Sequence, residues 1–273
     1  MHQNAHHQSS PRCVRFMTKD EVHAQVVRFR GKIAEGFLTN YYQQPLYADR
    51  LPAVLTDGMF AFLDSESFFD RLYFYAAPDS ASFEDLLADT TVRTVVLNYV
   101  GKGHPEQIEA LALRSGFYHH ARYHRYAGYY SYRPGCPPSP LMAHPAEIGE
   151  LHAALLSDCD VFCDHPPEKA KLAELMAQGQ VLVSRRQGLI SGYFIYQVMG
   201  MKGYMNYWFS RDKTDHLSNI HLLLAFYQEM SQRNIKYVFA WVNSQNANII
   251  SIHKKFGLSF DGLSDDIYVR NQP

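Results

Sequence analysis

Two polar segments near the C-terminal end of the chain carry the residue types best suited to chemistry. The segment 210–219 places Arg211 and Lys213 just before an apolar helical pattern. Cationic side chains and free N–H groups at a helix start can hold a phosphate, although a polar loop that merely caps the helix is the alternative. Further along, His253 has an ordinary pKa that suits proton transfer near pH 7. The structural alternative for His253 is a half-buried residue on an amphipathic helix.

A third segment has the outward appearance of a metal cluster. Cys159, Cys163 and His165 lie close together among several aspartates. Zinc sites in proteins prefer cysteines spaced by two to four residues together with a second pair elsewhere, and this chain has no second pair. We therefore predict a loop between two helices here, and no metal.

Rings and basic groups alternate in the segment Tyr118–Tyr126. Such a segment can stack nucleobases or sugars. A β-hairpin with one buried aromatic face and one solvated basic face explains the same pattern, and we predict the hairpin. The motifs typical of serine hydrolases, P-loop proteins and zinc peptidases do not occur in the sequence, so these classes lose their usual support.

The composition limits the partners and the compartment. Lys and Arg number 26 against 27 Asp and Glu, a net charge of −1, so no basic surplus predicts a nucleic-acid partner. Four cysteines are too few for a disulfide scaffold, and no apolar run approaches a membrane span. The polar, His-rich start, residues 1–15, predicts a disordered tail rather than a secretory signal. We expect a cytoplasmic protein with no membrane association.

Periodicity in the C-terminal half predicts the elements that must position these residues. The three strands after the second helix form an antiparallel meander, and Asn246 is a helix N-cap. The predicted elements are, in order, helices at 145–156 and 166–178, strands at 180–184, 190–199 and 204–209, a helix at 217–230, a buried strand at 237–242, a helix at 246–256, and one or two strands within 258–270.

The N-terminal half has a comparable mixture of helices and strands. Four prolines in residues 134–140 predict a linker, with one lobe at 16–133 and another at 141–273. The predicted elements of the first lobe are helices at 20–37, 83–88 and 104–115, strands at 59–63, 71–76 and 95–100, and an aromatic hairpin at 116–132.

A weak internal repeat relates the two halves. The strand 95–100, its helix and Gly116-Phe117 match the strand 237–242, its helix and Gly257-Leu258. Val100 precedes its glycine by 16 positions and Val242 precedes its own by 15, which indicates two lobes with a shared plan. Coincidence between two ordinary β-α-β pieces is the alternative.

The segment Asn246–Leu258 resembles the last strand-helix signature of the GNAT superfamily of N-acetyltransferases. In that family a strand is followed by Asn, a helix, often a Tyr seven residues after the Asn, and then Gly-Phe. Here Asn246 and Gly257 have the family spacing, His253 stands at the Tyr position and Leu258 replaces the Phe. The preceding order of two helices and a meander also agrees. The resemblance implies an α/β (α+β) fold with two GNAT-like lobes, each a mixed, mostly antiparallel sheet flanked by helices, and a degenerate first lobe.

The resemblance also implies a site. The third meander strand, with Tyr207, Trp208 and Phe209, would splay from the buried strand and hold the acyl thioester of acetyl-CoA or another acyl-CoA. The following helix would direct its N-terminus at the CoA diphosphate. The family loop there is glycine-rich, whereas 210–219 contains no glycine. Further cofactor contacts would come from Arg211, Lys213, Leu217, Ser218, Asn219 and Asn246.

Catalysis by direct transfer needs a neutral amine and a proton for the departing thiolate. The resemblance assigns the proton donor to His253, and Asp212 or His216 are candidates for the base. We expect an N-acyltransferase acting on a primary amine of a small metabolite or amino sugar, and the sequence leaves a homodimer open. Two alternatives remain: a catalytically inactive ligand-binding or scaffold protein of the same fold, and a Fem-like transferase that uses aminoacyl-tRNA.

Overall fold

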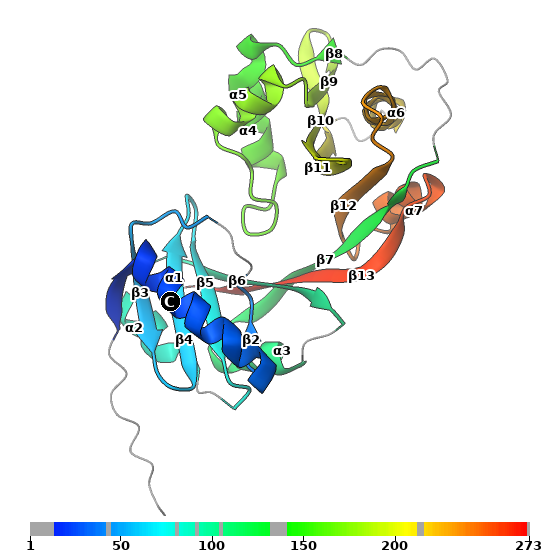
Figure 1. Ribbon diagram of the computed structural model, residues 1–273. Helices are drawn as coiled ribbons and strands as arrows, with labels where there is room; N and C mark the ends of the chain where they lie inside the picture. Colours follow the sequence, from blue (N-terminus) through cyan, green and yellow to red (C-terminus); the bar gives the residue numbers. More distant parts are fainter. Residues whose placement is uncertain are drawn as a thin grey trace, which may run out of the picture. The chain divides into compact units, whose positions relative to one another are not determined.

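The computed structural model describes residues 14–41, 45–79, 82–90, 93–103, 106–131, 141–211 and 216–271 (Figure 1). The chain divides into two compact units. The first contains the described residues up to Ala121 and those from Asp265 onward; the second is Arg122–Ser264. The proline-rich segment 134–140 and the predicted tail up to residue 13 lie outside the described residues, so the predicted linker and lobe boundaries stay predictions.

The first unit is a sheet with helices on both faces. Its strands follow the order β1-β3-β4-β5-β6-β13, with β2 paired to β5. The strands β5 and β6 run parallel, whereas the pairs among β1 to β5 are antiparallel. Its elements are β1 (Arg15–Thr18), α1 (Lys19–Lys32), η1 (Ile33–Glu35), β2 (Leu38–Thr39), β3 (Arg50–Leu55), β4 (Met59–Ser65), β5 (Asp70–Ala76), α2 (Glu84–Thr90), β6 (Val95–Lys102) and α3 (Glu106–Arg114).

Alternation along β4 explains why this sheet carries two layers of helices. Phe60 and Phe62 pack with Phe29 of α1, which crosses the sheet in Figure 1. The intervening Met59 and Ala61 belong to a second core formed with α2 and α3. Because successive side chains of a strand point to opposite faces, a continuous apolar run buries both faces.

The second unit repeats this plan. Its strands follow the order β7-β12-β11-β10-β9-β8, and β11 and β12 run parallel. Its elements are η2 (Pro145–Glu147), α4 (Ile148–Asp158), α5 (Lys169–Ala177), α6 (His216–Gln232), α7 (Ala247–Lys255), β8 (Leu141–Met142), β9 (Val181–Arg186), β10 (Leu189–Met199), β11 (Lys202–Ser210) and β12 (Tyr237–Asn243); β7 (Tyr118–Tyr129) and β13 (Ser259–Arg270) contribute residues to both units.

Two separate cores hold the helices of the second unit. Along β10, Phe194 and Tyr196 pack with α6, while Tyr193 and Ile195 pack with α4 and α5. The helices therefore pack on opposite faces of the meander, and the central strands are buried on both sides. Within the described residues, no helix combines the length and apolarity that crossing a membrane requires.

The repeat detected in the sequence has a structural counterpart in the way α3 and α7 end. Gly116 has φ +79° and Gly257 has φ +91°, the left-handed region that favours glycine. The next N–H in each case reaches back five residues, from Phe117 to the carbonyl of Ala112 and from Leu258 to that of His253, both at 3.1 Å. Both units thus use the same glycine-terminated helix to enter a long strand.

One predicted element is wrong. The segment 116–132 does not form a hairpin, because Tyr118–Tyr129 is the single strand β7, which pairs with β12 from Tyr123↔Asn243 to Tyr129↔Tyr237. No residue near the middle of this segment is a proline, and Gly128 lies near its end, so nothing there breaks the strand. The strands β1, β2, β3 and β8 were not predicted. The tail 258–270, predicted as one or two strands, forms the single strand β13.

The close packing of the meander gives a stability prediction. A Cβ added at Gly192 of β10 would lie 2.9 Å from Ser184 Oγ and 3.0 Å from the carbonyl oxygen of Phe209. We expect Gly192→Ala to lower the free energy of unfolding by about 1 to 3 kcal/mol, as overpacking does. Urea unfolding followed by circular dichroism measures it. Gly149→Ala in α4, where nothing lies within 4 Å of the added Cβ, is the control and should not destabilise.

Candidate active site

An extra residue in β11 shapes the middle of the second unit. Ile195 pairs with Tyr207 and Tyr196 with Met205, so Asn206 has no partner on β10. This is a β-bulge, in which two residues on one strand oppose one on its neighbour. A bulge bends its strand and redirects the backbone that follows, which makes Asn206 the point at which β11 leaves its regular path.

The bulge coincides with the end of pairing between β11 and β12. Their parallel register runs from Lys202↔Tyr237 to Met205↔Ala240 and stops there, although β11 continues to Ser210 and β12 to Asn243. The sequence-based expectation that these two strands splay is therefore confirmed. A cavity of about 160 Å³ lies between the diverging strands, and its walls include Asn206, Trp241 and Asn243.

Four of the predicted site residues line this cavity: Trp208, Phe209, Asn246 and His253. Asn246 also caps α7, because its side-chain oxygen accepts a hydrogen bond of 3.2 Å from the N–H of Ile249. Tyr207, which was predicted with them, does not line the cavity. Its ring is buried against α4 and α5, and its hydroxyl donates to the carbonyls of Asp164 and His165 at 2.8 and 2.7 Å.

His253 is more deeply buried than the sequence indicated. It is 2% exposed, and burial lowers the pKa of the imidazole to about 4. The prediction of an ordinary pKa near neutrality is thus wrong, since desolvation disfavours the charged form. Its Nδ1 atom and the shielded indole N–H of Trp208 have no hydrogen-bond partner in the described part of the chain, and the two rings lie 6.0 Å apart.

Asp164, one of the aspartates near Cys163, also lines the cavity. Its Oδ1 accepts a hydrogen bond of 3.2 Å from the hydroxyl of Tyr123, which also lines the cavity. Its Oδ2 accepts one of 2.8 Å from the N–H of Asp160. Burial raises the pKa of Asp164, with these hydrogen bonds acting in the opposite direction. The cavity between β11 and β12, which we call the wedge, therefore contains a shielded carboxyl group that can exchange protons.

The surroundings of Cys159 do not suit a metal ligand. Cys159 packs in the core beneath α4 and α5, and burial together with neighbouring aspartates raises the pKa of its thiol. A thiol binds metal as the thiolate, so this environment opposes ligation by Cys159. The segment itself is the predicted connection between two helices.

The predicted phosphate-binding residues are only partly described. Arg211 is exposed; its N–H donates to the carbonyl of Ser191 at 2.9 Å, and its guanidinium lies 3.8 Å from Asp158. Asp212 and Lys213 lie outside the described residues. The helix α6 begins at His216, but the side chains of His216, Leu217, Ser218 and Asn219 are outside the description as well. Their roles stay predictions.

Comparison with known proteins identifies the fold. No protein-family model matches the sequence, and no curated protein matches it by sequence. A tandem GNAT protein from the clavulanic acid biosynthesis pathway aligns over 96% of this chain and 99% of its own, with TM-score 0.57 and 12% identity. A GCN5-related N-acetyltransferase from Sphaerobacter thermophilus aligns over 82% and 81%, with TM-score 0.56 and 13% identity. The chain has a tandem GNAT fold, as the resemblance implied.

The burial of His253 predicts a pH dependence of stability. The imidazole has a pKa of about 4 in the folded chain against an ordinary 6.5, so between these values the unfolded chain binds more protons. Stability should therefore fall as pH is lowered from 7, by about 2 kcal/mol at pH 5 from this group. We expect His253→Gln to reduce the difference between the free energies of unfolding at pH 7 and pH 5. An undiminished difference would contradict a neutral buried imidazole.

Proposed function

We propose that the second unit is an acyl-CoA-dependent N-acyltransferase that transfers an acyl group, acetyl in the first instance, to a primary amine. The observation that carries the proposal is the wedge between β11 and β12, which opens at the Asn206 bulge and contains the cavity lined by Trp208 and His253. Beyond Met205, β11 no longer pairs with β12, so its backbone groups on that side are open to a ligand. Open N–H groups there can stabilise the oxyanion that forms when an amine attacks a thioester carbonyl.

The diphosphate of CoA would lie at the N-terminus of α6. The first N–H groups of a helix have no partner within it, and the helix dipole favours an anion at that end. This grip does not require glycine in the preceding loop, provided that the backbone leaves the helix end accessible. The fold supports acyl-CoA as the co-substrate class, while the acyl chain length is part of the proposal.

The proton balance of the reaction assigns roles to the cavity residues. The N–C bond forms and the C–S bond breaks; the protonated amine loses one proton before it attacks, and the second proton that the nitrogen loses as the amide forms passes to the departing thiolate. We propose Asp164 as the acceptor of the amine proton, because its carboxyl group lines the cavity and is hydrogen-bonded to Tyr123. His253 is neutral at pH 7, so its role is to offer an N–H hydrogen bond within the wedge rather than an imidazolium proton.

Asp164 also indicates the charge of the acceptor. Primary amines are protonated near neutral pH, and a shielded carboxylate attracts an ammonium group. The Tyr123 hydroxyl, whose pKa is raised by burial and by Asp164, stays protonated and keeps its donor directed at that carboxylate. The acceptor would therefore enter as a cation and lose its proton to Asp164 before attack.

Binding of the co-substrate is the first test. Titration calorimetry with acetyl-CoA should give saturable binding, and a thermal shift should rise with concentration, since a ligand at 100 times its dissociation constant stabilises by about 2.7 kcal/mol. Ile249→Trp, which fills the wedge, should weaken binding without unfolding the protein. An absent shift with acetyl-CoA and longer acyl-CoAs would favour a ligand-binding or scaffold protein, and a shift with aminoacyl-tRNA alone would favour the Fem-like alternative.

The role of Asp164 gives a separate prediction. We expect Asp164→Asn to lower kcat/KM for amine acylation by about 10² to 10⁴, the range typical of a lost general base, with acetyl-CoA affinity unchanged. Acylation is measured by thiol release. Asp160→Asn is the control, because it removes the same charge from the same loop yet keeps an oxygen that can accept from the N–H of Phe162. Equal activity of Asp164→Asn and the wild type would remove Asp164 from the mechanism.

A further inference from the structure

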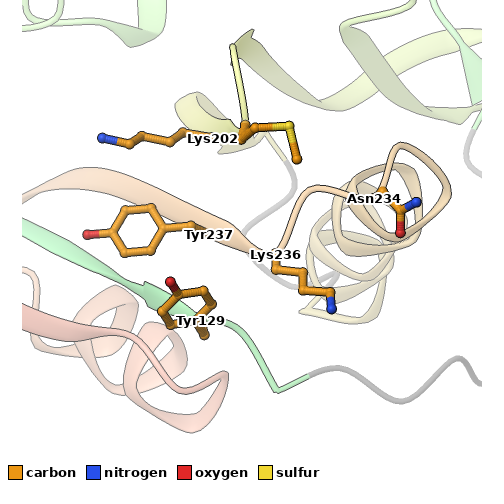
Figure 2. A pocket seen from close by; sticks show the side chains of 6 residues that line it. Tyr129, Lys202, Asn234, Lys236 and Tyr237 are labelled. Atoms are coloured by element: carbon orange, nitrogen blue, oxygen red, sulfur yellow. The ribbon is translucent and has the colours of Figure 1, made fainter.

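A second cavity lies at the opposite end of the β11–β12 pair from the wedge. Figure 2 shows its lining, in which Lys202, Tyr237 and Tyr129 come from three adjacent strands. Lys202 is in register with Tyr237, and Tyr237 with Tyr129, so the three side chains share one face of the sheet. The cavity has a volume of about 700 Å³, which suits a small organic molecule.

Aromatic contacts organise this wall. The Lys202 ammonium lies 5.7 Å from the centroid of the Tyr237 ring, and the Tyr129 ring meets that of Tyr237 edge-on at 5.5 Å and 81°. Tyr129 and Met201 are 73% and 71% exposed, an unusual degree for large apolar side chains. The exposed face of the Tyr129 ring can therefore pack against a flat apolar molecule.

The opposite rim is formed by the turn between α6 and β12, which carries Asn234 and Lys236. This turn is fixed by the bond from the N–H of Ile235 to the carbonyl of Met230, 2.9 Å, and by the Tyr130 hydroxyl, which donates to the carbonyl of Ile235 at 2.9 Å. Asn234 adopts φ +60°, a conformation that asparagine tolerates. Hydrogen bonds within the fold therefore hold this rim of the cavity in place.

Charge selects the ligand class. Lys202 and Lys236 are both exposed, and among the described residues neither side chain forms an ion pair with a carboxylate. Two ammonium groups that flank one cavity repel cations and attract anions. A carboxylate or sulfonate satisfies them, while the tyrosine rings and Met201 contact the rest of the molecule.

We propose that this cavity binds a planar organic anion, such as an aromatic carboxylate, at a site distinct from the wedge. Along β11, Lys202 is four residues from Asn206, about 13 Å at the rise of a strand. The wedge presents a carboxyl group and neutral donors to the proposed amine, whereas this cavity presents two cations to an anion. The assignment does not depend on acyl transfer.

The test uses 2-naphthoate as the probe and the full-length chain. Titration calorimetry should show saturable binding that Lys202→Ala/Lys236→Ala weakens by about tenfold or more, since charge-assisted hydrogen bonds are lost. Lys169→Ala/Lys171→Ala is the matched control, because it removes two exposed lysines from α5 of the same unit and should leave the affinity unchanged. Neutral 2-naphthamide should bind more weakly than 2-naphthoate.

The variant Tyr237→Leu tests whether the ring itself contacts the ligand, apart from any effect on the stability of the protein. It keeps both lysines and should weaken 2-naphthoate binding while the thermal unfolding midpoint stays close to that of the wild type. Saturating acetyl-CoA should not compete with 2-naphthoate. Equal affinity of the lysine variant and its control, equal affinity for the amide, or competition by acetyl-CoA would each overturn the proposal, whether or not the chain proves to be an acyltransferase.

Discussion

The candidate site of this protein depends on one surplus residue. Asn206 interrupts the ladder between β10 and β11, and at the same position the ladder between β11 and β12 ends. Up to Met205 the backbone of β11 is satisfied by strands on both sides; from Tyr207 onward it is satisfied by β10 alone. Backbone N–H and C=O groups require partners when shielded from water, so the gap is where we place the proposed ligand.

Local pattern predicted most of the second unit because its elements have strong signals. Period-2 alternation and short turns delimit the meander, and Asn246 with Gly257 delimits α7. The long strand β7 escaped detection because an aromatic-basic run is compatible with either a hairpin or one strand; pairing with β12, far away in the sequence, decides between them. The strands β2 and β8 have two residues each, too few for an alternation pattern, so they are recognised only by their pairing with a neighbouring strand.

The site was predictable only where its residues lie on the signature helix and strand. Asn246, His253 and Trp208 come from such elements, whereas Asp164 reaches the wedge from the loop between α4 and α5 and meets Tyr123 of β7. The contact between Asp164 and Tyr123 depends on tertiary packing, which residue spacing in the sequence does not reveal. The same limit applies to His253: its position follows from the helix, but its pKa follows from burial that only the packed structure provides.

The two units share a plan, and the comparison of their parallel strand pairs explains why we place chemistry in the second. In the first unit the pairing of β5 and β6 ends at Arg71↔Val96, and just beyond it the buried guanidinium of Arg71 is hydrogen-bonded to Asn98 of β6 and to Glu66. An ion-paired side chain bridges the strands there and satisfies its own donors. In the second unit the corresponding gap holds the unpartnered N–H of Trp208 and the unpartnered Nδ1 of His253. Shielded polar atoms without partners cost free energy, and a ligand that supplies the missing partners would recover that cost as affinity. The repeated fold thus supplies two similar strand pairs: Arg71 bridges the pair in the first unit, and the pair in the second unit holds the cavity in which we place the proposed ligand.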